Sequence, residues 1–221
     1  CARSGGFRSV SGPPDPFQPL LARASEELQA GRHQVAESIY RGILERAPGH
    51  PLAIHFLGIC LVQTGRAQEG LAALARSMVA LGREARFRHN YALMLAHAGD
   101  TAAAERELEA AIALDPRNVA SHNYLGMVRQ QLGRLDAAAA AYEAALALAP
   151  DDPFVATNYG NCLAAQGEFA KAIDYLRRSI ARAPRNPVAH NNLGSALSAA
   201  GDSRGAIAAY RKAAEVEPHY A

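Results

Sequence analysis

The chain has 221 residues, with 23 basic and 21 acidic side chains and a formal net charge of +2. This balance gives no reason to expect binding to nucleic acid or to an anionic membrane surface. Apolar residues make up 49% of the chain, which indicates a folded protein rather than a disordered one. The longest apolar stretch, residues 137–149, is too short to span a bilayer and contains Glu143.

The first element in chain order is a leader. Residues 1–16 are rich in Gly, Ser and Pro, so we expect them to be flexible. The chain begins at Cys1 rather than at a methionine, and two interpretations stay open. The one we prefer is a fragment of a longer, cytoplasmic protein. The alternative is a periplasmic bacterial lipoprotein that is acylated at Cys1 and held off the membrane by this leader.

The rest of the chain repeats with a constant period. Six glycines follow one another at intervals of 34 residues, namely Gly31, Gly65, Gly99, Gly133, Gly167 and Gly201. The period predicts six units, at residues 17–50, 51–84, 85–118, 119–152, 153–186 and 187–220. We expect each unit to contain two helices joined at its glycine, because glycine supplies the backbone freedom that a tight turn between helices needs.

Each second helix carries a small residue five positions after the glycine and a large one nine positions after it. The small residues are Ala36, Gly70, Ala104, Ala138, Ala172 and Ala206, and the large ones are Tyr40, Leu74, Leu108, Tyr142, Leu176 and Tyr210. A spacing of four places both on one helix face, where they can pack. A proline then ends the helix in every unit except the second, which has Gly82 instead. Ser77 of this unit also stands at a position, twelve residues after the turn glycine, that is mainly small and apolar in the other units. We therefore expect the second unit to pack loosely.

The period, the turn glycine, the small–large pairs and the terminal proline together resemble the tetratricopeptide repeat family over residues 17–220. The resemblance implies an all-α fold, a right-handed α-solenoid of six helix-turn-helix units. It implies that the first helix of each unit lines a concave groove and that the second lies outside. The style of the array is similar to tetratricopeptide regions of bacterial O-GlcNAc-transferase-like proteins and of sulfotransferases.

Polar and aromatic side chains recur six, nine and ten positions before the turn glycine. We expect these side chains to line a peptide-binding groove: His55, Phe56, His89, Asn90, Asn123, Tyr124, Met127, Asn158, Asn161, Asn191 and Asn192. An asparagine amide has one acceptor and two donors, so a row of amides can pair with the backbone of an extended peptide. This row is similar to the ladder of O-GlcNAc-transferase-like arrays, although Ala22, Phe56 and Tyr124 interrupt it. The alternative is that the asparagines are only a wet polar surface.

We find no motif that indicates catalysis, a cofactor or a metal. A phosphate-binding loop, a dinucleotide fingerprint, a zinc-protease motif and a nucleophile elbow are all absent from the sequence. The three cysteines, Cys1, Cys60 and Cys162, are odd in number and have no paired spacing, which argues against a disulfide framework and a zinc site. His122 and His190 stand where the family packs an aromatic side chain, which favours a structural role.

The sequence therefore predicts a non-catalytic scaffold that binds an extended polypeptide or a partner protein. Two alternatives stay open, namely the substrate-recruiting arm of a larger bacterial glycosyltransferase or sulfotransferase, and an envelope lipoprotein scaffold. Ile207, Tyr210 and Ala213 lie along one side of the last predicted helix, residues 204–217. Because a solenoid normally needs a polar cap, we expect self-association or a further domain at this side.

Overall fold

The computed structural model describes residues 15–217, and within that range the chain forms α-helices and no strand. The helices are α1 (Gln18–Gln29), α2 (His33–Arg46), α3 (Pro51–Gln63), α4 (Ala67–Leu81), α5 (Ala85–His97), α6 (Thr101–Leu114), α7 (Val119–Gln131), α8 (Leu135–Leu148), α9 (Pro153–Ala165), α10 (Phe169–Arg182), α11 (Pro187–Ala199) and α12 (Ser203–Val216). The expected all-α fold is confirmed. Residues 1–14 of the predicted leader lie outside the described residues.

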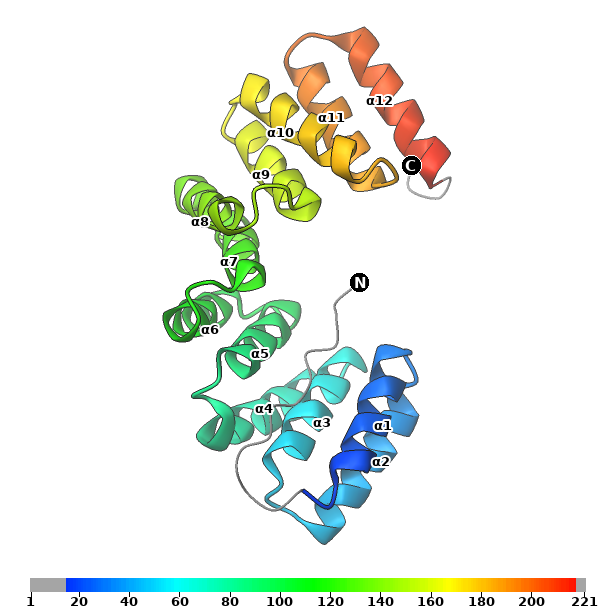
Figure 1. Cartoon of the computed structure of the whole chain (residues 1–221), viewed down its shortest axis with the longest axis vertical. Helices are drawn as coiled ribbons and strands as arrows, with labels where there is room; N and C mark the ends of the chain where they lie inside the picture. Colours follow the sequence, from blue (N-terminus) through cyan, green and yellow to red (C-terminus); the bar gives the residue numbers. More distant parts are fainter. Residues whose placement is uncertain (1–14, 218–221) are drawn as a thin grey trace. The chain divides into compact units, whose positions relative to one another are not determined.

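The chain divides into two compact units, Cys1–Arg83 with α1 to α4 and Glu84–Ala221 with α5 to α12 (Figure 1). The division falls one residue after Gly82, the position where the second repeat lacks its proline. We call these parts unit 1 and unit 2 and describe each by itself.

Each pair of helices is joined at one of the repeated glycines. All six glycines have positive φ angles, from 73° to 89°, and no other residue type has a positive φ within residues 15–217. At the turn between α7 and α8, the Gly133 amide donates to the carbonyl of Gln130 (3.0 Å), and the Arg134 amide donates to that of Arg129 (2.9 Å). This pair of bonds closes the end of α7 and needs a left-handed residue at position 133, which glycine adopts without a Cβ penalty.

The small residues let the two helices of a repeat pack closely. In the second repeat, a Cβ on Gly58 would lie only 2.8 Å from the carbonyl oxygen of Gly70, so α3 and α4 are almost in backbone contact. Ser77 is fully buried between them, where its hydroxyl donates to the Leu74 carbonyl (2.7 Å) and lies 3.1 Å from Nδ1 of His55. The expectation that the second repeat packs loosely is therefore wrong, because the backbones of α3 and α4 approach closely and the Ser77 hydroxyl is hydrogen-bonded between them.

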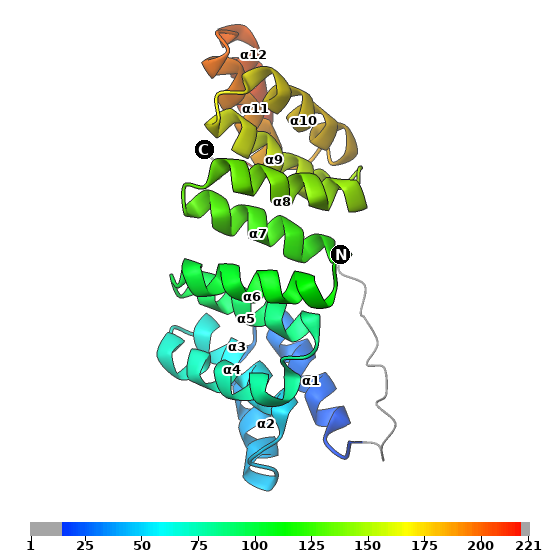
Figure 2. The ribbon, with the colours of Figure 1, turned by 90° about the vertical axis from the view of Figure 1, so that its left-hand side faces the viewer.

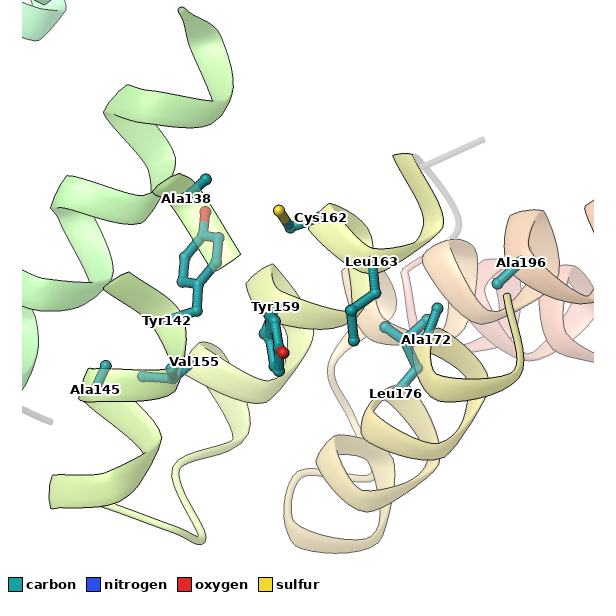
Figure 3. Close-up of a cluster of buried hydrophobic side chains, with 10 residues drawn as sticks. All are labelled: Ala138, Tyr142, Ala145, Val155, Tyr159, Cys162, Leu163, Ala172, Leu176 and Ala196. Atoms are coloured by element: carbon teal, nitrogen blue, oxygen red, sulfur yellow. The ribbon is translucent and has the colours of Figure 1, made fainter. Parts of the chain in front are cut away.

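The core of unit 2 is best seen around α8, α9 and α10. Tyr142 of α8 and Tyr159 of α9 are buried with ring centroids 6.2 Å apart, and Leu163 and Leu176 continue the cluster toward α10 (Figure 3). Burying a side chain of this size contributes about 1.5–3 kcal/mol to folding. In this cluster the large residue of α8, Tyr142, holds the fourth pair of helices to the fifth through Tyr159.

The first helices of unit 2 lie closer together than the second helices do. Helix α7 contacts α5 and α9, and α11 contacts α9, whereas α6, α8, α10 and α12 make no such contacts with one another within residues 84–217. The helices are stacked in chain order, with α6 and α8 to the left of α5 and α7 in Figure 1 (Figures 1 and 2). Unit 2 therefore has an inner face formed by the first helices and an outer face where the second helices separate.

Candidate functional site

The asparagines predicted to line a groove lie on the first helices of the repeats in unit 2. Asn90 on α5, Asn123 on α7, Asn158 on α9 and the pair Asn191–Asn192 on α11 are half-buried, and Asn161 is exposed. Helical spacing explains why these side chains do not enter the core: Asn158 and Asn161 are three residues apart, so they share one face of α9.

Side-chain amides connect α7 to α9 across this face. The side-chain Nδ2 of Asn158 donates to the side-chain Oδ1 of Asn123 (3.0 Å). In the same way, Nε2 of Gln130 donates to Oδ1 of Asn161 (3.0 Å). The hydroxyl of Tyr142 on α8 donates to the side-chain oxygen Oε1 of the same Gln130 (3.2 Å). Gln130 is not among the residues predicted to line the groove, although it stands three residues after Met127 and seven after Asn123, a spacing that places all three on one face of α7.

These bonds leave part of the hydrogen-bonding capacity of the amides unused. Within the described residues, Asn123 keeps both of its N–H donors, and Asn158 keeps one donor and its carbonyl oxygen. The bond between the two amides orients the remaining donors and acceptors. A backbone that crosses from α7 to α9 would therefore meet amide groups that are already held in place.

His89 and Tyr124 extend the polar row toward α5. Nδ1 of His89 lies 3.0 Å from the hydroxyl of Ser121, and its ring packs edge-on against Tyr124 at 5.6 Å. Burial lowers the pKa of His89, which favours the neutral ring. Met127 is partly buried against the core beneath this row.

In unit 1 one of the two predicted groove residues is fully buried and the other is partly buried. His55 is 0% exposed, so the prediction that it faces an open groove is wrong. The reason is that α3 is in contact with α1, α2 and α4, and most of its residues are buried. Phe56 is partly buried and stacks on Tyr40, with ring centroids 6.1 Å apart.

The other histidines singled out in the sequence have structural partners. Nε2 of His122 is 3.0 Å from the carbonyl oxygen of Pro116, and Nε2 of His190 is 2.9 Å from that of Pro184. Each ring therefore closes the loop that leads into its own helix, at equivalent positions two repeats apart. Both contacts agree with the structural role expected for these residues.

The remaining candidates for chemistry are also accounted for. Cys60 and Cys162 are buried free thiols that donate to the carbonyls of His33 (3.2 Å) and Leu135 (3.5 Å), and burial raises the pKa of both. Cys1 lies outside the described residues. Over residues 15–217, no three His, Cys, Asp or Glu side chains are grouped as metal ligands, and none of the helices is both long and apolar enough to cross a membrane.

The last helix keeps part of its apolar side exposed. Ala213 is buried, whereas Ile207 is 52% exposed and Tyr210 is 39% exposed. The Tyr210 ring lies against Gly194 of α11, where a Cβ would come within 2.7 Å of it. Self-association or a further domain at this side stays a prediction.

Comparison with family models identifies the class of protein. Three models, each described as a tetratricopeptide repeat, match the chain: one matches residues 27–88 and 163–221, one matches residues 85–110 and one matches residues 117–185. The chain belongs to the tetratricopeptide repeat family. This fold is typical of protein–protein interaction scaffolds and is generally non-catalytic.

Solved structures of the same fold cover most of the chain, and no curated protein matches it by sequence. PilF from Pseudomonas aeruginosa is 20% identical, with a TM-score of 0.77 over 91% of this chain and 91% of its own. YrrB, described as a tetratricopeptide repeat protein with an unusual peptide-binding site, is 17% identical, with a TM-score of 0.62 over 82% of this chain and 93% of its own. One chain in the structure of the Cut9–Hcn1 hetero-tetramer of the APC/C is 15% identical, with a TM-score of 0.75 over 90% of this chain and 40% of its own.

Proposed function

We propose that this chain is a non-catalytic scaffold that binds an extended polypeptide on the inner face of unit 2. The observation that carries the proposal is the pair of amide bridges from α7 to α9, Asn123–Asn158 and Gln130–Asn161. They form an ordered surface of amide groups. Asn90 and Asn192 extend this surface onto α5 and α11.

The chemistry of the amides favours the backbone of the ligand over its charged side chains. Each amide–backbone hydrogen bond contributes about 0.5–1.5 kcal/mol net. Several such bonds, less the cost of ordering the peptide, give a modest affinity. Because the asparagines are uncharged, added salt has little effect on binding at this surface.

Two exposed apolar side chains border the asparagines. Phe154 is 67% exposed and lies four residues before Asn158 on α9, and Val188 is 37% exposed and lies four residues before Asn192 on α11. A spacing of four places each on the same helix face as its asparagine. They favour a ligand that presents an apolar side chain beside the part of its backbone held by the amides. The likeness of the fold to YrrB, described as having a peptide-binding site, supports the same class of ligand.

The experiment selects peptides from a random peptide library on the immobilised protein and titrates them by calorimetry. The test variant changes Asn90, Asn158, Asn161 and Asn192 to alanine together. We expect selected peptides to bind this variant about tenfold more weakly or worse, a loss of about 1.4 kcal/mol or more. Far-UV circular dichroism and the unfolding midpoint should stay close to those of the parent, because these side chains are not in the core.

The matched control is Gln68→Ala, which removes an exposed amide from α4 in unit 1. This variant should bind the selected peptides as the parent does. Equal binding by the folded four-asparagine variant, or a library that yields no binder, would contradict the proposal.

A further inference from the structure

The outer face of unit 2 contains a hollow that the peptide-binding proposal does not use. It lies between α8 and α10, has a volume of about 740 Å³ and is floored by Tyr159 and Leu163 of α9. Asp136 and Glu143 of α8 stand along one wall, and Glu168 and Lys171 stand along the other. This volume falls within the range of ligand-binding clefts, about 300–1,000 Å³.

The corresponding place one repeat earlier is occupied by an ion-pair network. Between α6 and α8, Arg129 pairs with Glu105 (3.0 Å) and with Glu109 (2.7 Å), and Arg134 also pairs with Glu105 (2.7 Å). The long arginine side chains lie across the space between the two second helices. Every carboxylate of this network has an arginine partner.

A comparison of equivalent positions in the two repeats shows why the groove between α8 and α10 differs. Glu105 is replaced by Ala139, Arg129 by Leu163 and Arg134 by Glu168, and only Glu109 keeps its type, as Glu143. All four of these later residues line the hollow. The three replacements remove both arginines and each shortens the side chain, so the space opens and becomes acidic.

The carboxylates on α8 have neutral partners in this groove. Glu143 accepts a hydrogen bond from the hydroxyl of Tyr159 (2.5 Å), and Asp136 accepts one from the side-chain amide of Gln166 (2.8 Å). The one ammonium group that lines the hollow, that of Lys171, pairs with Glu168 (3.1 Å). Within the described residues, Asp136 and Glu143 therefore have no cationic partner.

We propose that the groove between α8 and α10 is a second docking site. Its ligand is a peptide segment that presents one apolar side chain with one basic side chain on each side of it. Asp136 and Glu143 are seven residues apart, which places them about 10.5 Å apart along α8. In an extended peptide, alternate side chains point the same way, and positions four apart are separated by about 13 Å. Flexible lysine stems bridge the small difference, and the middle side chain lies over Ala139 and Leu163.

The probe is a fluorescein-labelled peptide of about nine residues, with lysines at its third and seventh positions, leucine at its fifth and serine or glycine elsewhere. Fluorescence anisotropy should show saturable binding. Replacing both lysines with glutamate, or the leucine with serine, should weaken binding about tenfold. Raising the salt from about 50 to about 200 mM should also weaken it, in contrast to binding at the asparagines.

The test variant is Asp136→Asn/Glu143→Gln, which removes the charge and keeps the shape of both side chains. Binding of the lysine peptide should weaken about tenfold. The matched control is Glu109→Gln. Glu109 stands at the same repeat position as Glu143, but in the groove between α6 and α8, where Arg129 already pairs with it. This variant should bind the lysine peptide as the parent does. As a second measurement, Asp136→Lys/Glu143→Lys should prefer the glutamate peptide.

Three results would overturn this proposal. The first is the absence of saturable binding to the parent protein, and the second is unchanged binding to the folded double variant. The third is a dimer, seen by sedimentation, that the double variant disrupts, because the groove would then hold a second copy of this chain. The four-asparagine variant should bind the lysine peptide normally, so this site and the inner face can fail independently.

Discussion

The ring of Tyr142 lies against Gly126, so close that a Cβ at Gly126 would come within 2.5 Å of the ring atom Cε1. The tyrosine is 1% exposed and belongs to the core of unit 2. The absence of a side chain on α7 is therefore what lets α8 bury its largest residue. The pairs Gly160–Leu176 and Gly194–Tyr210 repeat this contact in the two following repeats.

Gly126→Ala should destabilise the protein although alanine is the better helix former. Overpacking of this kind costs about 1–3 kcal/mol, more than the gain in helix propensity of up to about 1 kcal/mol. Urea denaturation followed by circular dichroism measures the difference. Gly42→Ala in α2 is the control, since a Cβ there meets no atom within 4 Å, and it should stabilise the chain slightly. Equal effects of the two substitutions would contradict this account.

Acid should weaken unit 2 through His89. Burial lowers the pKa of this side chain from its ordinary 6.5, so the unfolded chain takes up a proton at a higher pH than the folded one. The free energy of unfolding should therefore fall as the pH drops below about 6.5, with a slope of at most about 1.4 kcal/mol per pH unit for one proton.

Substitution separates this histidine from the others. His89→Gln should show a smaller loss of stability between about pH 7 and pH 5 than the parent does. His97→Gln, which changes an exposed residue at the end of the same helix, should leave the slope as it was. A slope that His89→Gln does not reduce would assign the acid sensitivity to another group.

Arg129→Leu gives α7 the residue that α9 has at the same repeat position, Leu163. It removes the arginine from Glu105, whose side chain is only 12% exposed, and also from Glu109. We expect the free energy of unfolding to fall by about 1 kcal/mol. The difference from the parent should shrink in high salt, which screens the ion pairs.

The control for this variant is Lys212→Ala, which removes an exposed ion pair with Glu215 on α12. Its urea midpoint should equal that of the parent, because both partners are largely solvated. If Arg129→Leu is as stable as the parent at low salt, the network between α6 and α8 does not contribute to folding.

Asp152 begins α9 and should be needed for its stability. Its carboxylate accepts the backbone N–H groups of Phe154 (2.9 Å) and Val155 (3.1 Å), which have no partner within the helix. Asp152→Ala should cost about 1 kcal/mol in urea denaturation, whereas Asp152→Asn should retain most of the stability. Asp151→Ala, at the exposed neighbouring position, should have little effect, and a similar loss from both alanine variants would argue against capping.

The candidate site was only partly readable in the sequence. Asn123 and Asn158 were predicted to lie on one surface, and the structure places them in contact. His55 occupies the same repeat position as Asn123 but is enclosed, because α3 has apolar residues on nearly all sides and neighbours that cover them. A position within a repeat therefore predicts the direction of a side chain, but it does not predict whether another helix lies there.

What the sequence by itself determined is the local architecture of each repeat. The left-handed glycine at every turn and the close approach of small and large residues depend on positions within one repeat, and the same pattern recurs along the chain. Only the tertiary structure decided which polar groups meet water. The Arg129 network fills part of the groove between α6 and α8, while Ala139 and Leu163 leave the equivalent part of the next groove open, because burial and charge pairing depend on side chains that different helices bring together.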